Sequence, residues 1–140
     1  MNDIDFLIFP ALVLDFFDTI DYVENKGYLE VSTKLGIKTK SLIGCKICDS
    51  AGRIYEVSAL EDFGRINPFW TFEYFNPMHS IKLHLKEVSI NFEIVKTSVL
   101  KILDNEESVW QEDHLVYNLI SEVRKSSSQK ELINCFMAIR

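Results

Sequence analysis

The chain has 140 residues, of which 47% are hydrophobic, and its formal net charge is −6. This size and composition predict a single domain over residues 1–140 with one packed core, and they exclude a disordered chain. The negative charge disfavours direct contact with nucleic acids and anionic membranes, because both are polyanions.

The apolar segment over residues 6–17 raises the question of export or membrane insertion. Asp3 and Asp5 precede it, where a signal peptide needs basic residues. Asp15 and Asp18 interrupt the apolar run before it reaches the roughly 20 residues of a membrane-spanning helix. The three cysteines, an odd number, are typical of a reducing compartment. We therefore expect a cytoplasmic protein.

The first predicted element is an amphipathic helix over residues 10–25. Pro10 suits the first helical turn, and Gly27 suits the position just beyond the end. At about 100° per residue, one broad face collects the apolar side chains Leu12, Val13, Phe16, Phe17, Ile20 and Val23. Residues 28–40 stay open between strand and helix, since their alternating apolar residues favour a strand while their serines and threonines suit turns or caps.

A β-hairpin follows, with strands over residues 41–48 and 53–59. Its turn is Asp49-Ser50-Ala51-Gly52, in which the aspartate side chain opens the turn and glycine supplies the left-handed position. Residues 60–69 are expected to form a loop. Alternating patterns then predict strands over residues 70–74 and 81–85.

The C-terminal part of the chain changes to helical spacing. Helices are predicted from about residue 89 to 103 and from 113 to 125. Ser128 and Glu131 form a capping box that opens a last helix. The order of elements predicts an α+β fold: an antiparallel sheet of about four to five strands, packed against an N-terminal helix and three C-terminal helices.

Cys45 and Cys48 form a C-x-x-C motif, which in other settings is redox-active or binds zinc. Three residues apart on a hairpin strand, the two side chains point to opposite faces. No second paired motif supplies the further ligands that zinc needs, and the three histidines are scattered. We therefore expect no metal, no cofactor and no catalytic residue, and interpret the cysteines as small apolar strand residues.

The strongest candidate for a binding surface is acidic. Asp15, Asp18 and Asp21 are spaced three apart, so on a helix they share one face and repel one another. A partner that neutralises them would remove this repulsion, although a solvated face is the simpler interpretation. The predicted partner-binding residues are Asp15, Asp18, Asp21, the neighbouring Tyr22, and Glu61 and Asp62 from the loop after the hairpin.

The arrangement over about residues 41–138 resembles small bacterial immunity proteins, including those of contact-dependent growth inhibition. The resemblance lies in the Asp49–Tyr55 hairpin segment, the strand over 81–86 with alternating lysines, and the Asn-x-x-Ser-x-Trp run over 105–110 before the last helices. It implies a non-enzymatic protein that neutralises a toxin, often a nuclease, by occluding its basic active-site surface.

Two other function classes stay open at this point. One is a non-enzymatic adaptor or assembly subunit, which a constitutive partner or a stable homo-oligomer would favour. The other is a small-molecule enzyme or ligand-binding domain, which a deep polar pocket containing His84, His114 or the cysteines would favour.

Overall fold

The computed structural model describes residues 3–15, 19–66, 78–104 and 116–137. Within these ranges the chain forms one antiparallel sheet of six strands in the order β2-β1-β4-β5-β6-β3. The strands are β1 (Ala11–Asp15), β2 (Thr19–Val23), β3 (Val31–Thr33), β4 (Lys46–Cys48), β5 (Ile54–Arg65) and β6 (Met78–Val88). The helices are the short 3-10 helices η1 (Asp3–Phe6) and η2 (Lys26–Leu29), and the α-helices α1 (Lys34–Thr39), α2 (Phe92–Asp104), α3 (Val116–Lys125) and α4 (Gln129–Met137).

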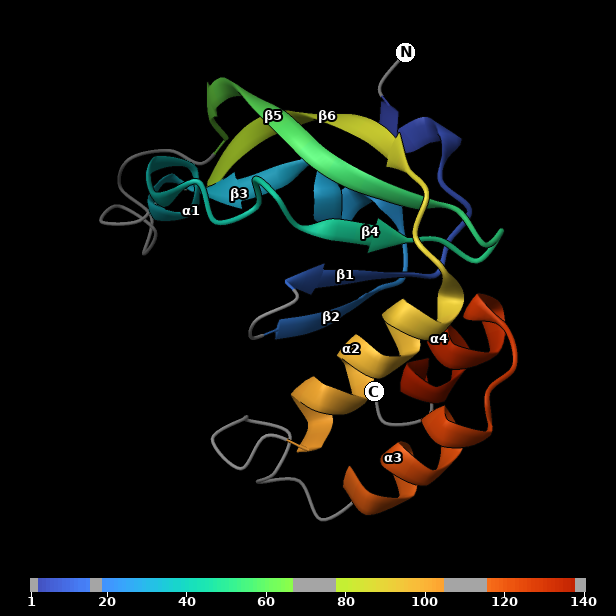
Figure 1. Ribbon diagram of the computed structural model, residues 1–140. Helices are drawn as coiled ribbons and strands as arrows, with labels where there is room; N and C mark the ends of the chain where they lie inside the picture. The colour runs from blue at the N-terminus through green and yellow to red at the C-terminus, as the bar shows by residue number, and fades with distance from the viewer. Residues whose placement is uncertain (1–2, 16–18, 67–77, 105–115, 138–140) are drawn as a thin grey trace.

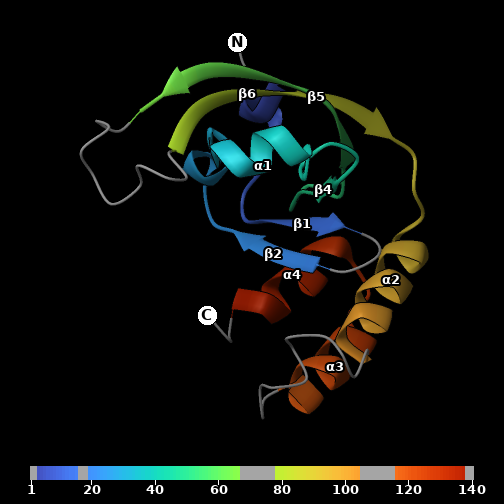
Figure 2. The same ribbon diagram turned by 90° about the vertical axis from the view of Figure 1, so that its left-hand side faces the viewer.

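The sheet is strongly curled, and its two sides are covered differently. In Figure 1 the helices α2, α3 and α4 gather beneath the β1–β2 hairpin, while β5 and β6 arch over the opposite side. Figure 2 shows α1 between this arch and the β1–β2 hairpin, in the mouth of the curl. The predicted packing of three C-terminal helices against the sheet is therefore confirmed, whereas the strand count of four to five is wrong.

Two clusters of buried side chains lie on the two sides of the sheet. The inner core, inside the curl, consists of Ile4, Leu7, Ala11, Val13, Val23, Leu29, Cys45, Ile47, Val57, Ile81 and Leu83. The helix-side core joins β1, β2, β4 and β5 to the three C-terminal helices through Leu12, Leu14, Ile20, Cys48, Ile54, Val95, Val99, Ile102, Leu103, Val116, Leu119, Ile120, Val123, Leu132, Ile133 and Phe136. Alternate residues of β1 supply both cores, so this strand is buried on both faces.

The predicted helix over residues 10–25 is wrong, because this segment contains β1 and β2. Ala11 and Val13 face the inner core while Leu12 and Leu14 face the helices. A strand buried on both faces has a continuous apolar run, which periodicity alone does not distinguish from a buried helix. The two strands pair in antiparallel register, with Val13 opposite Asp21.

The predicted hairpin around residues 49–52 is confirmed, although its strands have other limits. β4 spans only Lys46–Cys48 and pairs with β5 through Ile47 and Tyr55. The predicted loop over residues 60–69 is wrong as far as Arg65, because β5 continues along β6 to that residue. A bulge interrupts this pairing between Asp62 and Arg65, where Gly64 adopts a φ of +97° that glycine tolerates best. The expected strand over 70–74 lies outside the described residues.

The remaining predictions depend on local sequence signals, and they agree better with the structure. The strand over 81–85 and the three C-terminal helices are confirmed as β6, α2, α3 and α4. The Ser128 hydroxyl accepts a hydrogen bond from the Glu131 amide at 3.2 Å, as a capping residue does. Residues 28–40 contain both a strand and a helix, because β3 is followed by α1. The hydroxyl of Thr33, the N-cap residue of α1, accepts a hydrogen bond from the Gly36 amide at 3.0 Å.

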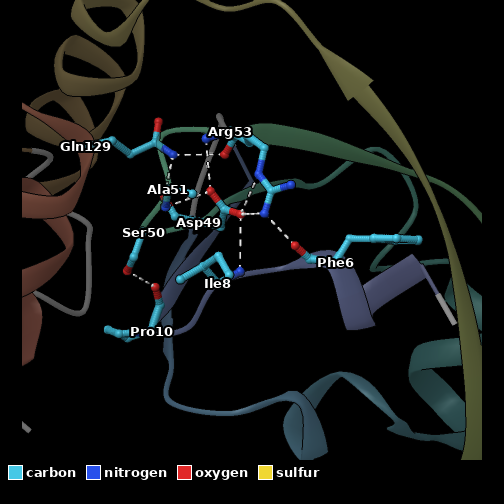
Figure 3. Close-up of polar contacts among 8 residues, drawn as sticks. All are labelled: Phe6, Ile8, Pro10, Asp49, Ser50, Ala51, Arg53 and Gln129. Atoms are coloured by element: carbon cyan, nitrogen blue, oxygen red, sulfur yellow. Dashed lines mark hydrogen bonds and ion pairs between the residues drawn. The ribbon is translucent and has the colours of Figure 1, made fainter.

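A buried carboxylate joins three distant parts of the chain at the β4–β5 turn (Figure 3). Asp49 is 0% exposed. Its Oδ1 accepts from the amides of Ala51 (3.1 Å) and Arg53 (2.9 Å), which shapes the turn. Its Oδ2 accepts from the Ile8 amide (3.2 Å) and from Nε (3.2 Å) and Nη2 (3.0 Å) of Arg53. Five hydrogen bonds therefore satisfy this carboxylate.

The neighbours of Asp49 extend this network in two directions. The Arg53 guanidinium donates to the Phe6 carbonyl, which fixes the N-terminal segment beside the turn. From α4, Nε2 of Gln129 donates to the carbonyls of Asp49 (2.7 Å) and Arg53 (2.9 Å). We call this set of contacts the Asp49 network. It connects the N-terminal segment, the hairpin and α4, which are far apart in sequence.

We predict that Asp49→Asn lowers the free energy of unfolding by about 3 kcal/mol, because the buried asparagine amide would place an N–H₂ donor against the Ile8 amide and the Arg53 guanidinium, which are themselves donors. Urea denaturation followed by circular dichroism measures the change. Asp104→Asn is the matched control, since Asp104 forms an exposed 3.8 Å ion pair with Arg124 and its substitution should change stability by less than about 0.5 kcal/mol. Equal effects of the two substitutions would contradict the importance of the Asp49 network.

Candidate functional site

The acidic residues of the predicted stripe belong to the β1–β2 hairpin rather than to a helix. Asp15 ends β1 and Asp21 lies in the middle of β2, while Asp18 lies outside the described residues. Burial raises the pKa of the Cys45 thiol, and the charges of Asp15 and Asp21 raise it further. Both carboxylates therefore act on the same region, near the start of β4.

Asp21 has no ion pair with any cation in the part of the chain that the structure describes. The residue is exposed by surface area, yet burial of its carboxylate raises its pKa above the usual aspartate value. Hydration of the charged oxygens, rather than the exposed area of the whole residue, sets the pKa of a carboxylate. Among the described residues no ion pair involves Asp21.

The structure separates Tyr22 from the acidic residues beside it. Asp21 lies opposite Val13 in the register and therefore shares the inner face of the sheet. Tyr22 lies opposite Leu12 and packs, half-buried, against the helix-side core. The two neighbours therefore point to opposite faces of β2, so the surface around Asp21 does not include the Tyr22 ring.

Glu61 and Asp62 lie elsewhere, on the β5–β6 ladder, where they are opposite Lys82 and Ile81 and so point to opposite faces of the sheet. Glu61 Oε1 lies 2.6 Å from Nε2 of His84, and Asp62 Oδ1 lies 2.8 Å from Nδ1 of His79. Both contacts join β5 to β6, beyond the point where β4 ends. In the sheet order this ladder and the β1–β2 hairpin lie on opposite sides of β4. The six predicted binding residues therefore do not gather into one site.

Sequence reasoning missed both histidine–carboxylate pairs. The partners are separated by 23 and 17 residues, so no local motif indicates them. A cross-strand signal exists in principle, because Glu61 is paired with Lys82 and therefore lies diagonal to His84. This signal can be used only when the strand register is known, and the register depends on recognising that β5 extends to Arg65.

The two cysteines of the C-x-x-C motif lie on opposite sides of the sheet, as predicted. Cys45 belongs to the inner core and Cys48 to the helix-side core. Burial, together with the charge of Asp49, raises the pKa of the Cys48 thiol to about 12. A redox or metal-binding pair needs accessible thiolates that point together, and this geometry provides neither.

Two further features of the described residues concern metal binding and membrane insertion. No three His, Cys, Asp or Glu side chains among these residues come close enough to hold a metal ion. None of the helices in the same ranges combines the length and apolar character needed to cross a bilayer. His114, one of the residues named for a ligand-binding function, lies outside the described residues.

Comparison with known proteins identifies no relative: no family model, curated protein or solved structure matches this chain.

We predict that the pKa of Asp62 lies below the usual 3.8 and rises toward it in His79→Ala. The hydrogen bond from His79 is the largest cause of the depression, followed by the bond from the Gly64 amide. The depressed pKa favours the folded state above about pH 4, and this contribution is lost as the pH falls through the folded-state pKa. Carboxyl-detected NMR titration measures the midpoint. His84→Ala is the matched control and should leave the Asp62 midpoint unchanged.

We also predict a fixed order of thiol modification. At pH 8 a thiol with a pKa near 12 is ionised to about one part in ten thousand, so Cys48 should resist iodoacetamide in the native protein. The half-buried Cys135 should react first. Mass spectrometry of digested samples measures each site, with urea-unfolded protein as the control in which all three react. Modification of Cys48 as fast as Cys135 in the native state would contradict the assignment.

Proposed function

We propose that the protein binds a basic toxin domain and neutralises it by covering the toxin's active-site surface, in the manner of bacterial immunity proteins. The observation that carries the proposal is the Asp21 carboxylate on the β1–β2 hairpin. Its pKa is raised by burial, and no cation among the described residues pairs with it. A lysine or arginine from a partner would compensate this charge.

The distribution of the remaining acids supports the same partner chemistry. Asp49 and Glu56 pair with Arg53 and Lys46 inside the fold, so these acids contribute little net field. The charges of Asp15 and Asp21 both raise the pKa of the Cys45 thiol, which places the two carboxylates near the same region of the sheet. With a net charge of −6 behind it, this hairpin would attract a basic cleft and exclude nucleic acid from it.

The first experiment is an affinity capture from the lysate of the native host with tagged protein, washed at low and then high salt. The proposal expects a basic partner that high salt releases. The partner is then purified and its toxic activity, for example nuclease activity, is measured with increasing protein. Inhibition at a one-to-one ratio supports the proposal. If the captured partner has no activity that the protein inhibits, the proposed toxin neutralisation is wrong, and an adaptor function is favoured.

We predict that Asp15→Lys with Asp21→Lys slows association with the toxin at least about tenfold at low salt, because steering depends on the local field. Stopped-flow fluorescence measures the rate constant. The matched control is Asp104→Lys with Glu122→Lys, which changes the net charge equally on exposed helical positions and should change the rate less than about threefold. If both double substitutions slow association equally, the hairpin is not part of the interface, although the toxin can still be the partner.

Asp21→Asn should separate binding from stability. Because the folded-state pKa of Asp21 is raised, ionisation of this group at neutral pH opposes folding. The uncharged variant should therefore be as stable as the parent or more stable, by less than about 0.5 kcal/mol for an exposed position, yet bind the toxin more weakly. Urea denaturation and calorimetric titration measure the two quantities. Loss of stability in this variant would contradict the role assigned to Asp21.

A further inference from the structure

The strand β2 forms one border of the sheet. It pairs with β1 over all five of its residues, and no strand within the described ranges pairs along its other side. Figure 1 shows β2 at the lower border of the sheet, above the C-terminal helices. In an antiparallel ladder the backbone N–H and C=O groups of alternate residues point away from the neighbouring strand. Alternate residues of β2 therefore direct their backbone groups toward the border, where a further strand could pair with them.

The two borders of the sheet differ in how they are protected against such pairing. At the opposite border, β3 has only three residues and leads directly into α1, and short strands are a common protection. β2 has five residues, contains neither proline nor glycine, and pairs with β1 without a bulge. Its protective feature is a charge: Asp21 lies at the centre of the strand and faces the inner side of the sheet.

The charge of Asp21 determines which strands can pair favourably with β2. If a second copy of the chain paired antiparallel over all five residues, Asp21 would lie opposite Asp21 of the second copy, and like charges directly opposite are destabilising. A lysine or arginine in the same place would attract the carboxylate. Burial raises the pKa of Asp21, so water screens this carboxylate less than one at an open surface. The border therefore favours a basic strand over a second copy.

The two faces of β2 define the other side chains that an added strand should carry. Val23 shares the inner face with Asp21 and belongs to the inner core. On the other face, Ile20 is buried in the helix-side core and Tyr22 is half-buried against it. An added strand alternates in the same way as its neighbour. Its basic residue should lie on the inner face, and apolar residues should follow Ile20 and Tyr22 on the helix side.

We propose that β2 pairs with an extended segment of the partner protein, which adds a strand to the sheet and places a lysine or arginine opposite Asp21. The identity of the partner rests on the proposed function, since a basic toxin domain would supply the segment. Backbone hydrogen bonds hold the segment, and the pair with Asp21 selects its basic character.

The test uses capped peptides and needs no toxin. The probe, acetyl-Thr-Val-Lys-Val-Thr-amide, matches β2 in length and carries lysine at its centre. It is titrated into the ¹⁵N-labelled protein, and the backbone amides of residues 19–23 are followed by NMR. The expected result is saturable shifts with a dissociation constant on the order of millimolar. The same peptide with glutamate in place of lysine should bind at least about fivefold more weakly.

Two N-methylated forms of the lysine peptide test the backbone pairing itself. One form is methylated at both valines, and the other at the lysine and the last threonine, so each loses hydrogen-bond donors along one edge only. Because only one edge of the peptide can face β2, one form should lose binding and the other should keep it. If both forms bind alike, the proposed strand pairing is wrong.

Substitution of Asp21 tests the charge selection. Asp21→Lys should reverse the preference, so that the glutamate peptide binds more tightly than the lysine peptide. Asp21→Asn should bind the two peptides within about twofold of one another, and it decides the question if the lysine variant does not fold. Asp104→Lys is the matched control, since it changes the net charge equally at an exposed position of α2, and it should keep the parent's preference.

Absence of saturable shifts, or an unchanged preference for the lysine peptide after substitution of Asp21, would overturn the pairing at β2. Peptide binding without any toxin captured from the host lysate would contradict the proposed function alone. Conversely, a captured toxin that leaves the β2 amides unprotected from hydrogen–deuterium exchange would contradict the strand pairing alone.

Discussion

The rest of the structure depends on one buried charge, the carboxylate of Asp49. It accepts five hydrogen bonds in a site that water does not reach. Burial of a carboxylate is unfavourable unless such bonds and a counter-ion replace its hydration, and here Arg53 supplies the counter-ion. The donors come from the N-terminal segment and the hairpin, and Gln129 of α4 binds the adjacent carbonyls, so the Asp49 network connects the sheet to both the N-terminal segment and α4.

The position of β1 between the two cores explains why the strand is buried on both faces. The strand lies between the inner core and the helix-side core, so its residues are apolar without interruption from Ala11 to Leu14. Sequence periodicity therefore predicted a helix there, although the fold class as α+β was correct. The β4–β5 turn and the C-terminal helices were predictable because their signals are local: the Asp49–Gly52 turn and the Ser128 cap. The extent of β5 was not, since residues beyond Leu60 are held in a strand by pairing with β6, which is remote in sequence.

The acidic character of the candidate site could be predicted from the sequence, but the positions of its residues relative to one another could not. Asp15 and Asp21 were recognised as acidic residues that a partner would neutralise, but the alternation of a strand places Asp21 and Tyr22 on opposite faces where a helix would have kept them adjacent. Glu61 and Asp62 were assigned to the same surface because nothing in the local sequence indicates His84 and His79 as their partners. Residue type follows from the sequence directly, whereas the grouping of residues depends on strand register.

Register also determines which acids are available to a partner. Across the ladders, Glu56 is adjacent to Lys46, and Glu61 lies diagonal to His84, so one carboxylate has a cation and the other an imidazole as its partner within the sheet. Asp21 lies opposite Val13, and no ion pair among the described residues involves it. Strand pairing therefore places Asp21, an acid without an ion pair among the described residues, on the β1–β2 hairpin. A basic partner that approached this position would be attracted by its carboxylate.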